Sequence, residues 1–222
     1  MINGHYILSK IYSCNNLLEV ILIIQIIISY LFGSISGSMI IGKFKKVDIR
    51  NMGSGNAGGT NAFRTQGALF ALGVITIDIL KGFIATYYIG MGYREITSLS
   101  LMCGFASVLG HIYPVYYNFK GGKGAGTLIG VLLALSLPKF TIPMLIGIWL
   151  LIIMLSGYVG LGTILTGLSF PIYLYISPDI LNELMGFGIA CAILIIFTHR
   201  SNIKRMIEGH ENQFEKIMIF KK

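Results

Sequence analysis

The chain has 222 residues, of which 55% are hydrophobic and only 12% are charged. Soluble globular domains usually carry charge on about 25% of their residues. This composition, with a mean hydropathy of +0.77, therefore excludes a disordered chain, a nucleic-acid-binding arm and most soluble enzymes. The net charge of +8 is typical of cytoplasmic loops in a membrane protein, and also of affinity for anionic lipids or anionic substrates.

Long apolar segments predict an all-α integral membrane protein with about seven transmembrane helices. A helix needs about 20 apolar residues to cross a hydrocarbon core of roughly 30 Å. The expected spans are 18–42, 67–91, 96–119, 124–137, two helices within 140–178, and 183–198. The fourth span is short, and 140–178 holds two helices only if the chain turns near Ser156–Gly157. Five or six spans are therefore the alternative.

The distribution of Lys and Arg predicts the orientation of the chain, because cytoplasmic loops are enriched in these residues. With seven spans the loops form two alternating sets. One set holds 13 Lys and Arg residues and consists of 43–66, 118–124, 156–158 and the tail from Arg200. The other set holds only Lys10, Arg94 and Lys139. We therefore expect the N-terminus outside and the C-terminus in the cytoplasm.

We expect residues 1–222 to form a single transmembrane domain, with an N-terminal extension at 1–17 and a cytoplasmic tail at 199–222. The cysteines include no CxxC pair and no even-numbered framework. Neither a disulfide nor a zinc site is therefore expected at Cys14, Cys103 or Cys191.

A few polar and small residues lie inside the apolar spans. Asp78 and Lys81 are three residues apart and share a helix face, so a structural ion pair and a contact with substrate are both open interpretations. For His111 a hydrogen-bonded histidine at the membrane interface is favoured. Gly33 and Gly37 form a GxxxG motif, for which close helix packing is favoured over a binding site.

Three polar clusters fall on the predicted cytoplasmic side, at 43–64, 119–127 and 199–211. Glycine lets backbone N–H groups approach an anion closely, because no Cβ blocks the way. Arg offers a bidentate hydrogen bond to phosphate, and Lys a point charge. We therefore expect the clusters to converge on one polar site at the cytoplasmic surface. Its two glycine-rich nests would hold two phosphates, or one phosphate from two sides.

The clusters also resemble a known family. GSGNAGGTNAFR at 53–64, HIYPVYYNFKGGKGAGT at 111–127 and HRSNIKRMIEGHE at 199–211 are similar to three motifs of the bacterial acyl-phosphate:glycerol-3-phosphate acyltransferases. The resemblance implies a seven-helix enzyme of the bacterial plasma membrane with its active site on the cytoplasmic side.

The same resemblance implies the reaction. A fatty acyl group would pass from acyl phosphate to the 1-hydroxyl of glycerol 3-phosphate, giving lysophosphatidic acid and inorganic phosphate in the first acylation of phospholipid synthesis. An upstream acyl-carrier-protein phosphate acyltransferase would supply the acyl phosphate.

The resemblance assigns roles by position in the motifs. Glycerol 3-phosphate is expected to contact Arg50, Ser54, Asn56, Thr60, Asn61 and Arg64. A phosphate, that of the acyl donor on this interpretation, is expected in the glycine loop of Lys120, Gly121, Gly122, Lys123 and Gly124. The catalytic residues are expected to be His199, Asn202 and Glu211. We also expect substrate contacts from Ser34 and Thr163, the latter because Gly160 lacks a hydroxyl where the family is serine-rich.

The sequence also bears on the acyl donor and on cofactors. Acyl-CoA-dependent glycerol phosphate acyltransferases use HxxxxD, in which the carboxylate orients a basic histidine. None of the four histidines here has Asp five positions on. An acyl phosphate is a reactive mixed anhydride, and its own phosphate oxygen can accept the hydroxyl proton. We therefore expect no metal and no coenzyme. The expected partners are glycerol 3-phosphate, fatty acyl phosphate and membrane lipid, and not nucleic acid.

A transporter or binding protein for a phosphorylated metabolite is the alternative function. Transporters usually place their ionisable site near the middle of the bilayer, between repeats. Here Asp78 and Lys81 are the charged residues within a span, whereas the polar clusters crowd one face. This distribution favours the enzyme.

Overall fold

The computed structural model describes residues 4–92, 96–177 and 182–219, and the regular structure within them is helical. The α-helices are α1 (Gly4–Gly33), α2 (Gly37–Lys45), α3 (Gly59–Gln66), α4 (Ala68–Ile84), α5 (Ser98–Ile112), α6 (Ala125–Ala134), α7 (Thr141–Ser156), α8 (Val159–Ile176), α9 (Asn182–Thr198) and α10 (Arg200–Ile207). Shorter helical turns are η1 (Ile49–Asn51), η2 (Ala85–Ile89, a π-helix), η3 (Val115–Tyr117) and η4 (Glu215–Ile217). Arg94 and the side chains of Lys10 and Cys14, which entered the predictions above, lie outside the described part of the chain.

The first span, expected to be continuous over 18–42, is interrupted between α1 and α2. The Ser34 hydroxyl donates to the carbonyl oxygen of Tyr30 at 2.9 Å, a bond that competes with the helical ladder. The backbone N–H of Gly37, at the start of α2, donates to Oδ1 of Asp78 at 3.4 Å. Because the first N–H groups of a helix lack intrahelical acceptors, this carboxylate helps to fix where α2 begins.

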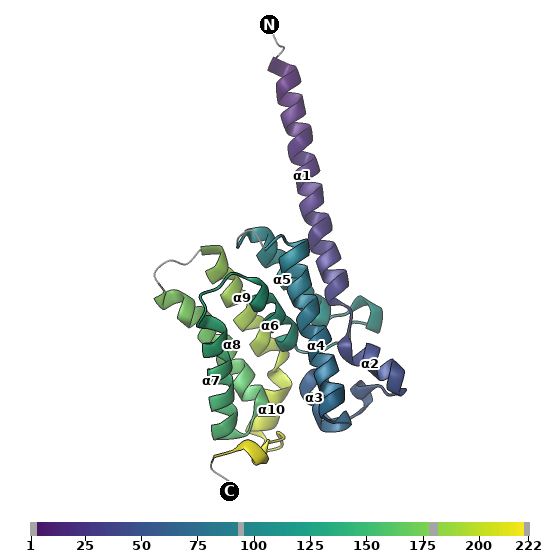
Figure 1. Ribbon diagram of the computed structural model, residues 1–222, viewed down its shortest axis with the longest axis vertical. Coiled ribbons are helices and arrows are strands. Elements are labelled where there is room, and N and C mark those ends of the chain that lie inside the picture. Colours follow the sequence, from purple (N-terminus) through teal and green to yellow (C-terminus); the bar gives the residue numbers. More distant parts are fainter. Residues whose placement is uncertain (1–3, 93–95, 178–181, 220–222) are drawn as a thin grey trace.

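Helix α1 begins at Gly4, so most of the expected N-terminal extension continues the first span. Its N-terminal part projects from the bundle (Figure 1). Its other end packs closely on α5, because a Cβ at Gly33 would overlap the backbone of Ser107. A Cβ at Gly37 would lie 2.7 Å from the carbonyl oxygen of Val74 in α4. The packing interpretation of the GxxxG motif is confirmed.

Among the described residues, four segments are long and apolar enough to cross a membrane: Leu17–Lys45, Ala68–Ile89, Ser98–Tyr117 and Val159–Ile176. Helices α9 and α10, bent by 51° at their junction, add a fifth if they count as one span. Helices α6 and α7 are apolar but shorter, with 10 and 16 residues. The count of seven spans stays a prediction.

The turn expected near Ser156–Gly157 is confirmed. Helix α7 ends at Ser156, and Gly157 follows with a φ of +75°, a left-handed conformation that glycine adopts without strain. Helix α8 then returns from Val159 alongside α7. The described residues of this uncharged stretch therefore form two antiparallel helices, as the sequence predicted.

The core lies mainly between the helices of the second half of the chain. It contains side chains from each of α5 to α9, among them Leu101, Val131, Leu145, Phe170 and Cys191. Cys103 and Cys191 are buried and unpaired, as expected. A smaller cluster around Phe70 and Val74 joins α3 and η1 to α4. Figure 1 shows α3 and α10 at the end of the bundle opposite the N-terminus, so two of the three polar clusters gather there.

Candidate active site

Lys123 lies where the second and third polar clusters meet. It belongs to the glycine loop before α6, and its Nζ donates a hydrogen bond to Oδ1 of Asn202 in α10. The Thr198 hydroxyl, at the end of α9, donates to the Lys123 carbonyl oxygen at 3.1 Å. The second and third clusters, separated by 79 residues at the Lys123–Asn202 contact, therefore converge as expected.

Glu211 holds Asn202 in a fixed orientation. Its Oε1 accepts a hydrogen bond from Asn202 Nδ2 at 2.8 Å, and its Oε2 accepts one from Arg205 Nε at 2.7 Å. The Glu211 side chain is only 1% exposed, so these bonds form away from water, where they are strong. Because the amide nitrogen of Asn202 is engaged by Glu211, its amide oxygen is left to face Lys123.

His199 is buried at the junction of α9 and α10. Its Nδ1 lies 2.8 Å from the carbonyl oxygen of Ile195. A carbonyl oxygen only accepts, so Nδ1 carries the hydrogen, and in the neutral ring Nε2 is the acceptor. In the described part of the chain, no group of three or more His, Cys, Asp or Glu is placed to hold a metal ion.

The cluster carries more positive than negative charge. Burial lowers the pKa of Lys123 from its usual 10.5 to about 8, with a further decrease from Arg205 and Arg64 and an opposing increase from Glu211. Three cationic groups therefore share one carboxylate. Such a site, partly removed from water, favours an anionic ligand.

Arg64 reaches this cluster from α3, in the first motif. Its Nη2 donates to the carbonyl oxygen of Asn212 at 3.2 Å, and its Cζ lies 5.1 Å from the centre of the Phe214 ring. The guanidinium has further N–H donors beyond this one bond. The first motif thus joins the second and third at the same end of the bundle.

Helix α8 packs closely against the cluster through Gly160. A Cβ at this position would lie 2.9 Å from Asn202 Nδ2, so the residue that lacks a hydroxyl also leaves room for the amide. Thr163 donates to the Val159 carbonyl oxygen at 3.0 Å and accepts from Trp149 Nε1 at 3.2 Å. The contact of Thr163 with substrate stays a prediction.

Ser34, also expected to bind substrate, is fully buried between α1 and the end of α5. Besides its bond to Tyr30, its hydroxyl accepts from the Val115 N–H at 3.4 Å. Both contacts stabilise the α1–α2 break. Its contact with substrate likewise stays a prediction.

Arg50 and Lys120 line a separate polar pocket of ≈ 380 Å³, together with Asp48, Asn51, Gly55, Asn118 and Gly121. Arg50 is engaged within the protein, because its Nε and Nη2 lie 3.0 and 2.7 Å from the Asp48 carboxylate. The guanidinium lowers the pKa of Asp48. The contacts of Arg50 and Lys120 with substrate stay predictions.

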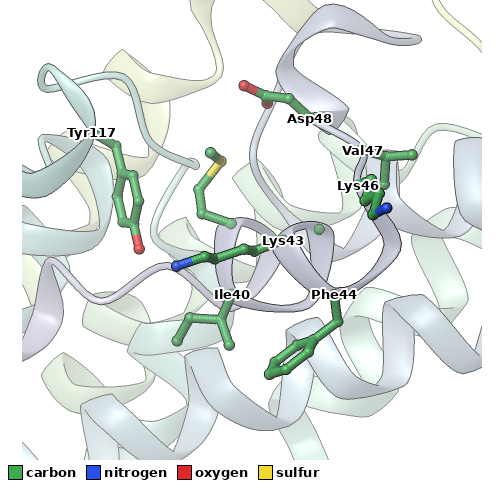
Figure 2. Close-up of a pocket in the computed structure, with 9 residues that line it drawn as sticks. Ile40, Lys43, Phe44, Lys46, Val47, Asp48 and Tyr117 are labelled. Carbon is green, nitrogen blue, oxygen red and sulfur yellow. The ribbon is translucent and has the colours of Figure 1, made fainter.

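A larger pocket of ≈ 700 Å³ adjoins the polar one at Asp48 and lies over the end of α2. Figure 2 shows the Lys43 side chain directed toward Tyr117, while Phe44 points away on the other side of the helix. Phe44 is 85% exposed. This surface combines a lysine with apolar side chains, as at a membrane interface.

Asn61 shapes the loop of the first motif. Its Nδ2 donates to the carbonyl oxygens of Ile49, Met52 and Asn56 at 2.9 to 3.0 Å, and its Oδ1 accepts from the Ser54 N–H at 3.0 Å. Asn61 is 1% exposed, so its amide is used within the protein. Ser54 is exposed, and Asn56 and Thr60 are partly exposed; their contacts with substrate stay predictions.

The intramembrane charges form a buried triad. Lys81 Nζ lies 3.0 Å from Asp78 Oδ1 and 2.9 Å from His111 Nδ1, and it donates to the Ile35 carbonyl oxygen at 2.7 Å. The structural ion pair is therefore confirmed. His111 is hydrogen-bonded as expected and is buried in this triad, and its location at the membrane interface stays a prediction. Its carbonyl oxygen accepts from Gly122 N–H at 3.1 Å, which connects the triad to the glycine loop.

Sequence reasoning did not name Arg205 or Phe214 as site residues, although Arg205 lies in the third polar cluster. Arg205 is three residues after Asn202 and so shares its helix face, a signal that was available. Phe214 follows the motifs in a polar tail, and no spacing rule connects it with Arg64.

The described residues define a helical integral membrane protein with a cationic cluster at one end of the bundle. The family model for glycerol-3-phosphate acyltransferases matches residues 23–209. A glycerol-3-phosphate acyltransferase from Finegoldia magna is 44% identical, covering 88% of this chain and 97% of the relative. That of Chlorobaculum tepidum is 40% identical, with 85% and 94% covered.

Two crystal structures of PlsY, described as an integral membrane glycerol 3-phosphate acyltransferase, share the fold. The glycerol 3-phosphate form has a TM-score of 0.81 at 37% identity, and the lysophosphatidic acid form has 0.79 at 36%. Each covers 87% of this chain and 95% of the solved chain. This chain belongs to the glycerol-3-phosphate acyltransferase family, which confirms the resemblance of its motifs.

Proposed function

We propose that this chain transfers a fatty acyl group from acyl phosphate to the 1-hydroxyl of glycerol 3-phosphate, giving lysophosphatidic acid and inorganic phosphate. The observation that carries the proposal is the partly buried cluster of Arg64, Lys123 and Arg205 around the single carboxylate of Glu211. Both proposed substrates bear phosphate, and a cluster with excess positive charge stabilises phosphate by charge-assisted hydrogen bonds. The names of the relatives and the two PlsY forms support the choice of acceptor.

The proposed roles combine the observed contacts with the positions of the residues in the three motifs. Arg64 and Lys123 bind phosphate, with Arg64 on glycerol 3-phosphate and Lys123, with the backbone of the glycine loop, on the acyl donor. Asn202 and His199 contact the reacting groups, and Glu211 keeps the Asn202 amide in place. These groups bring the two substrates together and stabilise charge in the transition state. Because the acyl donor is already reactive, these two effects account for most of the lowering of the activation barrier.

The proposed chemical step needs no protein base. The acceptor hydroxyl oxygen attacks the acyl carbonyl carbon, and the bond from that carbon to the phosphate oxygen breaks. The departing phosphate takes up the hydroxyl proton, so the products are the ester and inorganic phosphate. This step requires no metal ion and no coenzyme.

We also propose the seven-span arrangement, with the N-terminus outside, the C-terminus in the cytoplasm and the site on the cytoplasmic face of a bacterial plasma membrane. The predicted cytoplasmic loops hold 13 Lys and Arg residues and the other loops hold three, and this imbalance supports the proposed orientation. The test replaces the native cysteines by alanine and introduces Lys139→Cys or Lys204→Cys, both at exposed positions. A membrane-impermeant maleimide should label Lys139→Cys in intact cells, and Lys204→Cys only after permeabilisation. The opposite pattern would reverse the orientation.

The test of the activity uses purified protein with glycerol 3-phosphate and palmitoyl phosphate. We expect release of inorganic phosphate together with lysophosphatidic acid, and little product when palmitoyl-CoA replaces palmitoyl phosphate. Comparable rates with palmitoyl-CoA, or loss of activity with a chelator, would contradict the proposed donor chemistry. In the cell, an upstream acyl-carrier-protein phosphate acyltransferase would supply the donor.

A flux assay in proteoliposomes tests the transporter alternative. Uptake of glycerol 3-phosphate without lysophosphatidic acid formation would favour transport. We expect product formation without net uptake.

A further inference from the structure

Residues 212–219 form a strap that is fastened at both ends. The strap begins directly after Glu211, whose carboxylate is held by Asn202 and Arg205. Farther on, the N–H of Phe214 donates to the Gly157 carbonyl oxygen and that of Ile219 to the Met154 carbonyl oxygen, both at 2.9 Å. The strap therefore crosses from the site to the end of α7 (Figure 1).

The strap also meets Arg64. Its Asn212 carbonyl oxygen accepts a hydrogen bond from Arg64 Nη2 at 3.2 Å, and the Phe214 ring lies under the guanidinium at 5.1 Å. The ring also packs against Phe63, with ring centres 5.8 Å apart. Three contacts thus fix the Phe214 ring and the arginine relative to each other.

The contacts with Asn212 and Phe214 restrict the motion of the Arg64 side chain. Arg64 repels Lys123 and Arg205, which share its surroundings, and a long arginine side chain is free to turn away into water. A hydrogen bond and a cation–π contact oppose that motion. A side chain that is already in place loses less conformational freedom when it binds an anion.

We propose that the strap positions Arg64 for phosphate binding, and that Phe214 is the positioning residue. The inference rests on the proposed function, because it assigns Arg64 to glycerol 3-phosphate. The strap follows the last residue of the family match, which ends at 209, so this support is supplied by residues beyond that match.

The test compares two phenylalanines that each lie against an arginine. Phe214→Leu removes the ring at the site. The control, Phe197→Leu, removes a ring that lies 4.4 Å from Arg200 on an exposed part of α9. We expect Phe214→Leu to raise KM for glycerol 3-phosphate about two- to tenfold, with kcat and Tm unchanged. Phe214→Tyr keeps the ring and should have the wild-type KM, as should the control Phe197→Leu.

A double-mutant cycle separates positioning from a general structural role. If Phe214 acts through Arg64, Phe214→Leu should raise KM less than about twofold in an Arg64→Lys background. An unchanged KM for Phe214→Leu, or an equal increase in both backgrounds, would overturn the proposal. If Phe214→Leu fails to fold, Phe214→Met keeps the apolar contact with Phe63 without the ring and takes its place.

The failure of the proposed function is a distinct outcome. Wild-type protein that makes no lysophosphatidic acid would refute the function. The strap is then tested by calorimetric titration with glycerol 3-phosphate, where Phe214→Leu should weaken binding by the same factor. Equal affinity in both proteins would refute the strap.

Discussion

Lys123→Ala is the sharpest single test of the site. The substitution removes an ammonium group that lies among Arg64, Arg205 and Glu211. The loop itself should stay in place, because the Thr198 hydroxyl binds the Lys123 backbone carbonyl and not its side chain. The loss should therefore concern phosphate binding more than folding.

The size of the effect follows from the kind of contact that is lost. A hydrogen bond to a charged group contributes about 1.5–3 kcal/mol, which corresponds to about 10- to 100-fold in kcat/KM. The two arginines remain in the cluster, so some phosphate affinity should survive. We expect a strongly reduced but measurable rate.

The assay follows inorganic phosphate released from palmitoyl phosphate as the concentration of palmitoyl phosphate is varied. Lys139→Ala is the matched control, since Lys139 is an exposed lysine in the loop before α7. It should behave as wild type. Activity of Lys123→Ala equal to that of wild type and control would refute the assignment of Lys123.

Three further predictions follow from the same contacts. The pKa of Lys123 is lowered to about 8, so its ammonium form prevails below that pH and is lost above it. The KM for palmitoyl phosphate should therefore stay nearly constant from about pH 7 to 8 and then rise by up to tenfold per pH unit. A KM that stays constant up to about pH 9.5 would contradict this. Gly160→Val should lower kcat/KM about 10- to 100-fold, because the added side chain would displace the Asn202 amide. The control is Gly147→Val, where the space is open, and it should keep the wild-type kcat/KM. Equal kcat/KM values for the two variants would refute the packing argument. Asp78→Ala leaves Lys81 buried without its counter-charge and should lower the free energy of unfolding by about 3–5 kcal/mol. Thermal unfolding in detergent should show a lower Tm that is partly recovered in Asp78→Ala/Lys81→Met, and a double variant no more stable than the single would count against the ion pair.

The sequence alone determined the properties that depend on local pattern. Apolar length predicted the long helices, including the two that turn at Gly157, but not the break between α1 and α2. Residues three apart share a helix face whatever the fold, so the Asp78–Lys81 pair was available from spacing. The three motifs identified the family, because residue types in order along the chain require no knowledge of how helices pack.

Only the tertiary structure decided which of these groups meet. Contacts between residues more than 60 positions apart depend on helix rotation and loop path, and no local pattern encodes either. The sequence predicted that the polar clusters meet, but only the fold shows that Lys123 bonds to Asn202, 79 residues further along the chain. Helix packing also buried His111 of α5 beside Lys81 of α4, which lies 30 residues earlier in the chain. It also set Phe214 against Arg64 across 150 residues of chain, a contact that exists because α3 and the strap meet at one end of the bundle.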